Sequence, residues 1–99
     1  MDANEKHRLY FEQMVFLFQS AALQHMGKLK NPASDKVERS LPEAQFMIDM
    51  LDMIQTRTKG NLGPDEERLL TTVIKELKLN YVDEMNKPDP APETTQAAK

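Results

Sequence analysis

The 99-residue sequence contains no cysteine, and it has only three glycines. Without cysteine, disulfides, thiolate zinc sites and cysteine-ligated iron–sulfur clusters are excluded. The glycines are not arranged as a loop that could hold phosphate, and no GxSxG sequence marks a serine nucleophile. Because the common signatures of catalysis and of cofactor binding are missing, we expect a protein that is not an enzyme and that needs no cofactor.

The sequence also lacks an excess of positive charge and lacks a long apolar run. It has 13 Lys and Arg against 16 Asp and Glu, a net charge of -3, whereas nucleic-acid binding requires a basic surface. The longest apolar run, Met14–Phe18, is too short to span a bilayer, and the first eight residues do not resemble a signal peptide. We therefore expect a cytoplasmic protein with neither nucleic acid nor membrane as a partner.

What the chain does contain is apolar residues at helical spacing. In the first third they recur every three or four residues and predict a helix over about residues 4–29, with one broad apolar face. The face consists of Phe11, Met14, Val15, Phe18, Ala21, Ala22, Met26 and Leu29. Asn31-Pro32 then predicts a turn, and residues 30–39 are expected to form a loop. This region also carries a small basic patch, which we expect to be solvated and which consists of Lys28, Lys30, Lys36 and Arg39.

Two more helices have clear boundary signals. Ser40 and Glu43 fit a capping box that would begin a helix over residues 41–59, and Gly60 fits the left-handed position after it. Gly63 and Pro64 suit the start of a third helix over residues 64–86. The four-residue link predicts an antiparallel hairpin. Residues 87–99, with three prolines, are expected to be a disordered tail.

The predicted fold is therefore all-α, with a long first helix, a loop and an antiparallel helical hairpin in one domain over residues 1–86. The core of such a short chain is small, and self-association is a common way to stabilise it. We accordingly expect the helices to assemble as an oligomeric bundle.

The second helix is apolar on two opposite sides. One stripe consists of Ala44, Met47, Ile48, Leu51 and Ile54. The other stripe consists of Phe46, Met50 and Met53. The first helix likewise carries a second, narrower seam, which consists of Leu9, Phe16 and Leu23. One small domain can bury a single stripe on each helix, and methionine side chains adapt readily to a binding partner. We therefore predict that Leu9, Phe16, Leu23, Phe46, Met50 and Met53 form interfaces.

Two other kinds of function stay open beside a homodimer or other homo-oligomer. The Met-rich face could instead bind a larger protein, which would make the chain an accessory subunit. A weaker alternative is a metal-binding or catalytic bundle built around His25, Asp49 and Asp52. Neither histidine of the chain has a Glu three positions before it, as in the Glu-x-x-His pairs of di-metal bundles. We therefore expect structural roles for these three side chains and no metal site.

A more specific pattern runs from Leu41-Pro42 through Ile48-Asp49 to Lys59-Gly60-Asn61-Leu62 and Tyr81-Val82. With the first helix, this pattern resembles a family of small bacterial helical proteins known only as a domain of unknown function. The resemblance covers about residues 10–85, and the Lys-Gly-Asn-Leu connection is its most specific part. It implies an all-helical, cytoplasmic bacterial protein, and it implies no activity, ligand or catalytic residue.

Overall fold

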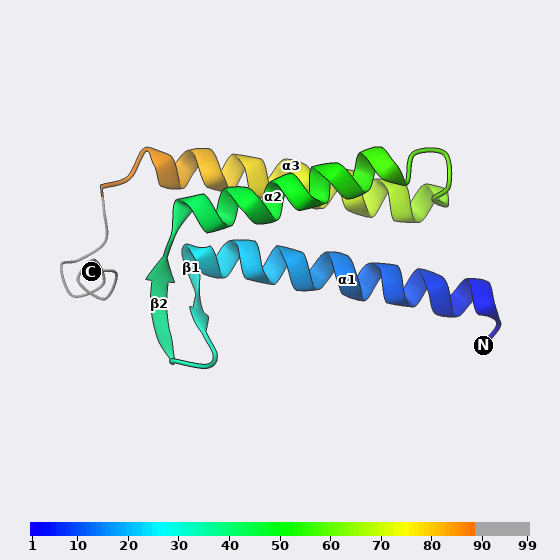
Figure 1. The fold of residues 1–99 in the computed structure, drawn as a ribbon, viewed down its shortest axis with the longest axis horizontal. Helices are drawn as coiled ribbons and strands as arrows, with labels where there is room; N and C mark the ends of the chain where they lie inside the picture. Colours follow the sequence, from blue (N-terminus) through cyan, green and yellow to red (C-terminus); the bar gives the residue numbers. More distant parts are fainter. Residues whose placement is uncertain (89–99) are drawn as a thin grey trace.

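The computed structural model describes residues 1–88, which form three helices and one β-hairpin. In chain order the elements are α1 (Ala3–His25), β1 (Met26–Asn31), β2 (Lys36–Arg39), α2 (Leu41–Arg57) and α3 (Pro64–Met85). The three helices lie side by side, and the hairpin projects from one end of the bundle (Figure 1). The α2–α3 connection and the N-terminus lie at the other end.

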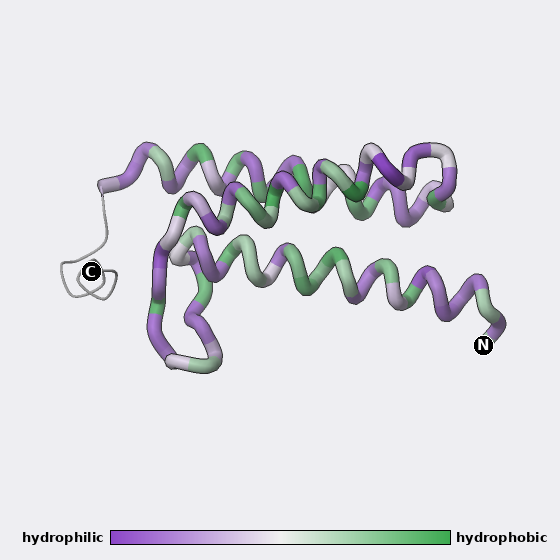
Figure 2. The backbone as a smooth tube through the Cα atoms, in the orientation of Figure 1, coloured by the Kyte–Doolittle hydropathy of each residue, from purple (hydrophilic) through white to green (hydrophobic). Residues whose placement is uncertain are grey.

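Each helix contacts the other two, so a single core runs between them. The buried hydrophobic residues are Val15, Ala22, Met26, Ala44, Ile48, Leu51, Leu70, Val73, Ile74 and Leu77. On each helix these residues follow the three-and-four spacing of one face. Hydrophobic residues (green) recur along α2 and the middle of α1, whereas the first turns of α1 are mainly hydrophilic (Figure 2).

The first helix is shorter than the sequence predicted, because it ends at His25 and not at Leu29. Gly27 has a φ of 85°, a left-handed conformation that stops the helix and that suits glycine. A Cβ at this position would also lie 3.4 Å from the Cβ of Arg39. Met26 is fully buried as predicted, but as the first residue of a strand, whereas Leu29 is 43% exposed.

The predicted loop is wrong as well, since residues 26–39 form a two-stranded antiparallel sheet and its turn. Asn31 organises the turn: its side-chain oxygen accepts from Ala33 N–H at 2.9 Å, and its backbone oxygen accepts from Asp35 N–H at 2.7 Å. Its amide also donates to Glu38 at 3.0 Å. The fold is therefore mostly α-helical with a small β-hairpin, and it is not purely α-helical.

The start of α2 agrees with the sequence except for half of the capping box. Ser40 is the N-cap, and its hydroxyl accepts from the Glu43 N–H at 3.4 Å. The Ser40 N–H does not donate to the Glu43 carboxylate, as a full capping box requires, but donates to the His25 carbonyl at 2.7 Å. This backbone bond ties the start of α2 to the end of α1 and occupies the donor that the box would have used.

The α2–α3 connection is close to prediction. α2 ends at Arg57, two residues earlier than expected, and Gly60 is left-handed with a φ of 86°. Gly63 precedes α3, and its N–H donates to the Glu66 carboxylate at 2.8 Å. Of the predicted tail, residues 89–99 lie outside the described part of the chain. None of the helices in residues 1–88 has the length and hydrophobicity needed to cross a membrane.

Candidate interaction surfaces

The outward face of α2 carries the predicted second stripe, which we call the α2 outer strip (Phe46, Met50 and Met53). Phe46 is 54% exposed and Met53 is 46% exposed, and Met50 is half-buried. On the opposite side of the helix, Ile48 and Leu51 are almost completely buried. The separation of α2 into a buried and an outward apolar face is therefore confirmed, while the role of the outward face as an interface stays a prediction.

The predicted seam on α1 is less uniform. Leu9 and Phe16 are 41% and 42% exposed, but Leu23 is half-buried against the core and is the least available of the three. Leu9 lines an open hollow with Asp65, so this end of the seam faces the first turn of α3, and the seven-residue spacing puts Phe16 on the same side of α1. Leu9 and Phe16 therefore form a surface separate from the α2 outer strip.

A third apolar surface was missed from the sequence. Leu79 and Val82 on α3 are 63% and 52% exposed, and they line a groove of about 390 Å³ between α2 and α3. Polar side chains border the groove, among them Asp52 and Lys78, which form an ion pair at 3.1 Å. The three-residue spacing of Leu79 and Val82 was the available signal, because it places both outside the core stripe of α3.

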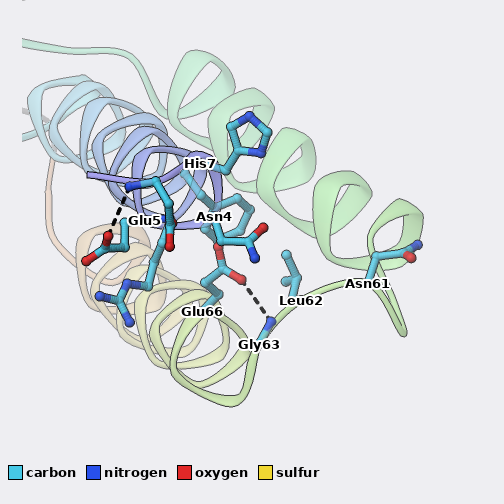
Figure 3. A pocket seen from close by; sticks show the side chains of 10 residues that line it. Asn4, Glu5, His7, Asn61, Leu62, Gly63 and Glu66 are labelled. Atoms are coloured by element: carbon cyan, nitrogen blue, oxygen red, sulfur yellow. Dashed lines mark hydrogen bonds between the residues drawn. The ribbon is translucent and has the colours of Figure 1, made fainter.

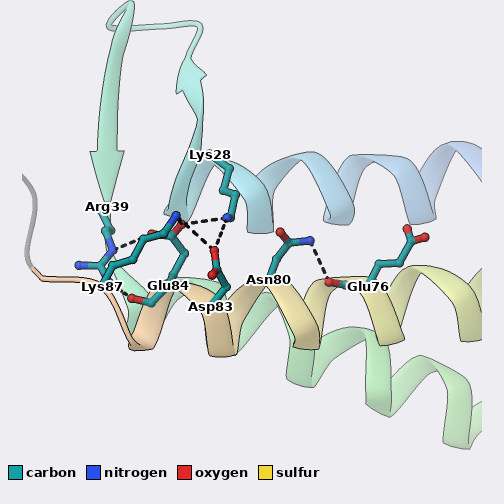
Figure 4. A network of polar contacts seen from close by, with 7 residues as sticks. All are labelled: Lys28, Arg39, Glu76, Asn80, Asp83, Glu84 and Lys87. Atoms are coloured by element: carbon teal, nitrogen blue, oxygen red, sulfur yellow. Dashed lines mark hydrogen bonds and ion pairs between the residues drawn. The ribbon is translucent and has the colours of Figure 1, made fainter.

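The strongest polar cluster joins the hairpin to the end of α3 (Figure 4). The Glu84 side chain is buried, and its carboxylate lies 2.9 Å from Lys28 Nζ, 2.9 Å from Lys87 Nζ and 3.4 Å from Arg39 Nε. Arg39 also donates through Nη2 to the Glu84 backbone oxygen at 2.5 Å. Asp83 pairs with Lys28 at 3.0 Å and with Lys87 at 3.2 Å.

These contacts correct half of the expectation that the basic patch is solvated, since Lys30 and Lys36 are exposed as expected but Lys28 and Arg39 are not. The side chains of Lys28 and Arg39 are only 24% and 8% exposed, because they turn toward α3. Burial acts to raise the pKa of Glu84, but the hydrogen bonds from Lys87 and Lys28 outweigh it, so this pKa lies below its usual value. The same pairing raises the pKa of Lys28, mainly through Glu84. The cluster is thus a charged clamp between hairpin and helix.

An open hollow of about 570 Å³ lies at the opposite end, between the first turns of α1 and the α2–α3 connection (Figure 3). Two carboxylates that line the hollow, those of Glu5 and Glu66, already accept hydrogen bonds at helix starts. Glu5 accepts from the Asp2 N–H at 3.1 Å, and Glu66 accepts from the Gly63 N–H at 2.8 Å. The hollow therefore resembles the joint between helix ends more than a site built for a ligand.

The candidate metal-binding and catalytic side chains do not converge. Asp49 accepts from the Gln45 amide at 2.8 Å, and Asp52 pairs with Lys78, so the two carboxylates make separate structural contacts. His25 is half-buried at the end of α1. Within residues 1–88, no group of three or more His, Cys, Asp and Glu side chains is arranged to hold a metal ion.

Comparison with known proteins places the chain in a family. The model of the Domain of unknown function (DUF1844) matches residues 8–83. The chain belongs to this family. No curated protein and no solved structure matches the chain. The matched range includes most of α1, the whole β-hairpin, all of α2 and almost all of α3. The DUF1844 domain therefore contains both the α2 outer strip and the hairpin.

The resemblance expected from the sequence is therefore confirmed at the level of the family. Its most specific segment, Lys59-Gly60-Asn61-Leu62, forms the α2–α3 connection. Gly60 supplies the left-handed turn there, and Leu62 packs against the core. In this DUF1844 domain the segment thus has a structural explanation as the closure of the helical hairpin.

Proposed function

We propose that this protein is a self-associating helical interaction module, most simply a homodimer, rather than an enzyme. The observation that carries the proposal is the α2 outer strip, where Phe46 and Met53 remain about half exposed although the core beneath α2 is complete. Contact of two such strips would remove this apolar surface from water, which is the main driving force for association. The exposed Leu9 and Phe16 provide a second surface for a larger assembly.

Light scattering over a range of micromolar concentrations tests the proposal. We expect a mass above that of one chain that falls toward the monomer on dilution. Met53→Glu should shift the protein to monomer, because it places a charge in the apolar contact. Thr56→Glu is the matched control, since Thr56 is an exposed residue of α2 outside the strip, and it should leave the mass unchanged. A monomer at every concentration would refute self-association.

The second candidate function is an accessory subunit that binds a larger protein. It is favoured by the groove at Leu79 and Val82, which lies on the α2–α3 side and would remain uncovered in a dimer formed through α2 alone. A purified accessory subunit should be monomeric, and the groove variant Leu79→Glu should reduce the material that co-purifies from native cells. Bacterial origin and a cytoplasmic location belong to the proposal in the same way, as expectations from the sequence.

A further inference from the structure

The α2 outer strip is longer than its three apolar residues. Glu43 and Arg57, both exposed, continue it at either end, so that the strip reads Glu43, Phe46, Met50, Met53 and Arg57. The spacing alternates three and four residues, which is the spacing of a seam between two paired helices. Glu43 lies in the first turn of α2 and Arg57 in the last. An acidic residue and a basic residue therefore flank an apolar centre.

We propose that two copies of the chain pair through α2 in antiparallel orientation, with the two-fold axis beside Met50. This inference rests on the proposed self-association and adds the partner's orientation and register. Glu43 and Arg57 are each seven residues from Met50, a rise of about 10.5 Å along the helix. In the antiparallel pair Glu43 therefore lies level with Arg57 of the second copy, and Phe46 lies nearly level with Met53.

Charge decides the orientation. A parallel pair would place Glu43 against Glu43 and Arg57 against Arg57, which are repulsive contacts at both ends of the seam. The antiparallel pair replaces both with attractive contacts. It also brings the positive N-terminus of each helix beside the negative C-terminus of the other.

The flanks of the strip are compatible with this pairing. Asp49 is the acidic residue nearest the axis, but it lies to one side of the strip, and its carboxylate is hydrogen-bonded to Gln45 still farther round the helix. Met47 and Ile54 on the other flank pack against the domain's own core. The strip has five residues, compared with roughly 20–30 per side in a standard interface, so we expect a weak pair whose dimer fraction depends on concentration.

The absence of native cysteine permits a direct test by single-cysteine crosslinking in the full-length protein. Met50→Cys should crosslink to itself with a short thiol–thiol reagent. Glu43→Cys and Arg57→Cys should each fail to crosslink alone, because identical positions are about 21 Å apart along the pair, but an equimolar mixture of the two should give a mixed dimer. Asp52→Cys is the control for random collision, since it lies close to the axis in height but on the α3 side of α2.

Each outcome decides between the hypotheses when the same samples are measured by light scattering. Crosslinking of Glu43→Cys and of Arg57→Cys with themselves would show a parallel pair and overturn the inference. If light scattering shows dimers but neither Met50→Cys nor the mixture of Glu43→Cys and Arg57→Cys crosslinks more than Asp52→Cys, the interface lies elsewhere. That result overturns the inference and leaves self-association intact. A monomer throughout would overturn both.

Discussion

Replacing Glu84 by glutamine should lower the free energy of unfolding substantially although the side chain hardly changes shape. Glu84→Gln keeps the side-chain volume but removes the charge that Arg39, Lys28 and Lys87 share. Removing one partner of a fully buried ion pair costs about 3–5 kcal/mol. Here Arg39 keeps its bond to the Glu84 backbone oxygen, and the lysines remain partly exposed and can turn to water. We therefore expect a loss of about 2–3 kcal/mol, a large part of the stability of so small a domain.

Urea denaturation followed by circular dichroism measures this loss, and its pH dependence provides an internal check. Because the pKa of folded Glu84 lies below its usual value of 4.5, its contribution is present above that pH and is lost as the pH falls through the folded pKa. The wild type should thus lose more stability than Glu84→Gln between pH 6 and the acid range. A loss below about 0.5 kcal/mol at neutral pH, with identical acid profiles, would show that the clamp contributes little.

Three further predictions concern α2 and the two left-handed glycines. Met50→Glu should yield a folded protein with weakened association, whereas Met47→Glu should reduce helix content, because Met47 packs on the core; equal unfolding of both variants would show that Met50 belongs to the core. Ser40→Ala should cost about 0.5 kcal/mol in urea denaturation, the low end for a cap, since its bond is 3.4 Å long; no loss would show that the hydroxyl does not cap α2. Gly27→Ala should lower the free energy of unfolding by about 1 kcal/mol or more, and by more than Gly60→Ala, because a Cβ at position 60 has no atom within 4 Å. Equal losses would mean that the hairpin shifts easily to make room for the new Cβ.

The helices were predictable because several local signals agreed with one another. Around α2 and α3, apolar spacing, Ser40, Gly60 and the Gly63-Pro64 pair all indicated the same boundaries, and the structure follows them within two residues. The inward face of α2 followed from periodicity alone. Such agreement depends only on neighbours in sequence, which is why it could be found without knowledge of the tertiary contacts.

The hairpin and the charged clamp could not be found in this way. Met26 and Leu29 continue the apolar period of α1, and only the left-handed conformation of Gly27 interrupts it. Strand β2 contains a single sizeable apolar residue, so it lacks the alternation that marks a half-buried strand. Glu84 is buried because Arg39 and Lys28 approach from a segment more than forty residues away, and no local pattern encodes that approach.

Charges at the ends of α2 have an ordinary explanation, because an acid near the N-terminus and a base near the C-terminus each stabilise an isolated helix. The helices of this protein do not all carry such charges at both ends, since α3 has three acidic residues in its first turn and no basic residue in its last. What sets α2 apart is the angular position of its charges, since Glu43 and Arg57 fall on the strip that carries Phe46, Met50 and Met53. A helix dipole would be served equally well by charges anywhere round the helix. Their alignment with the apolar residues is what a self-complementary, antiparallel contact requires.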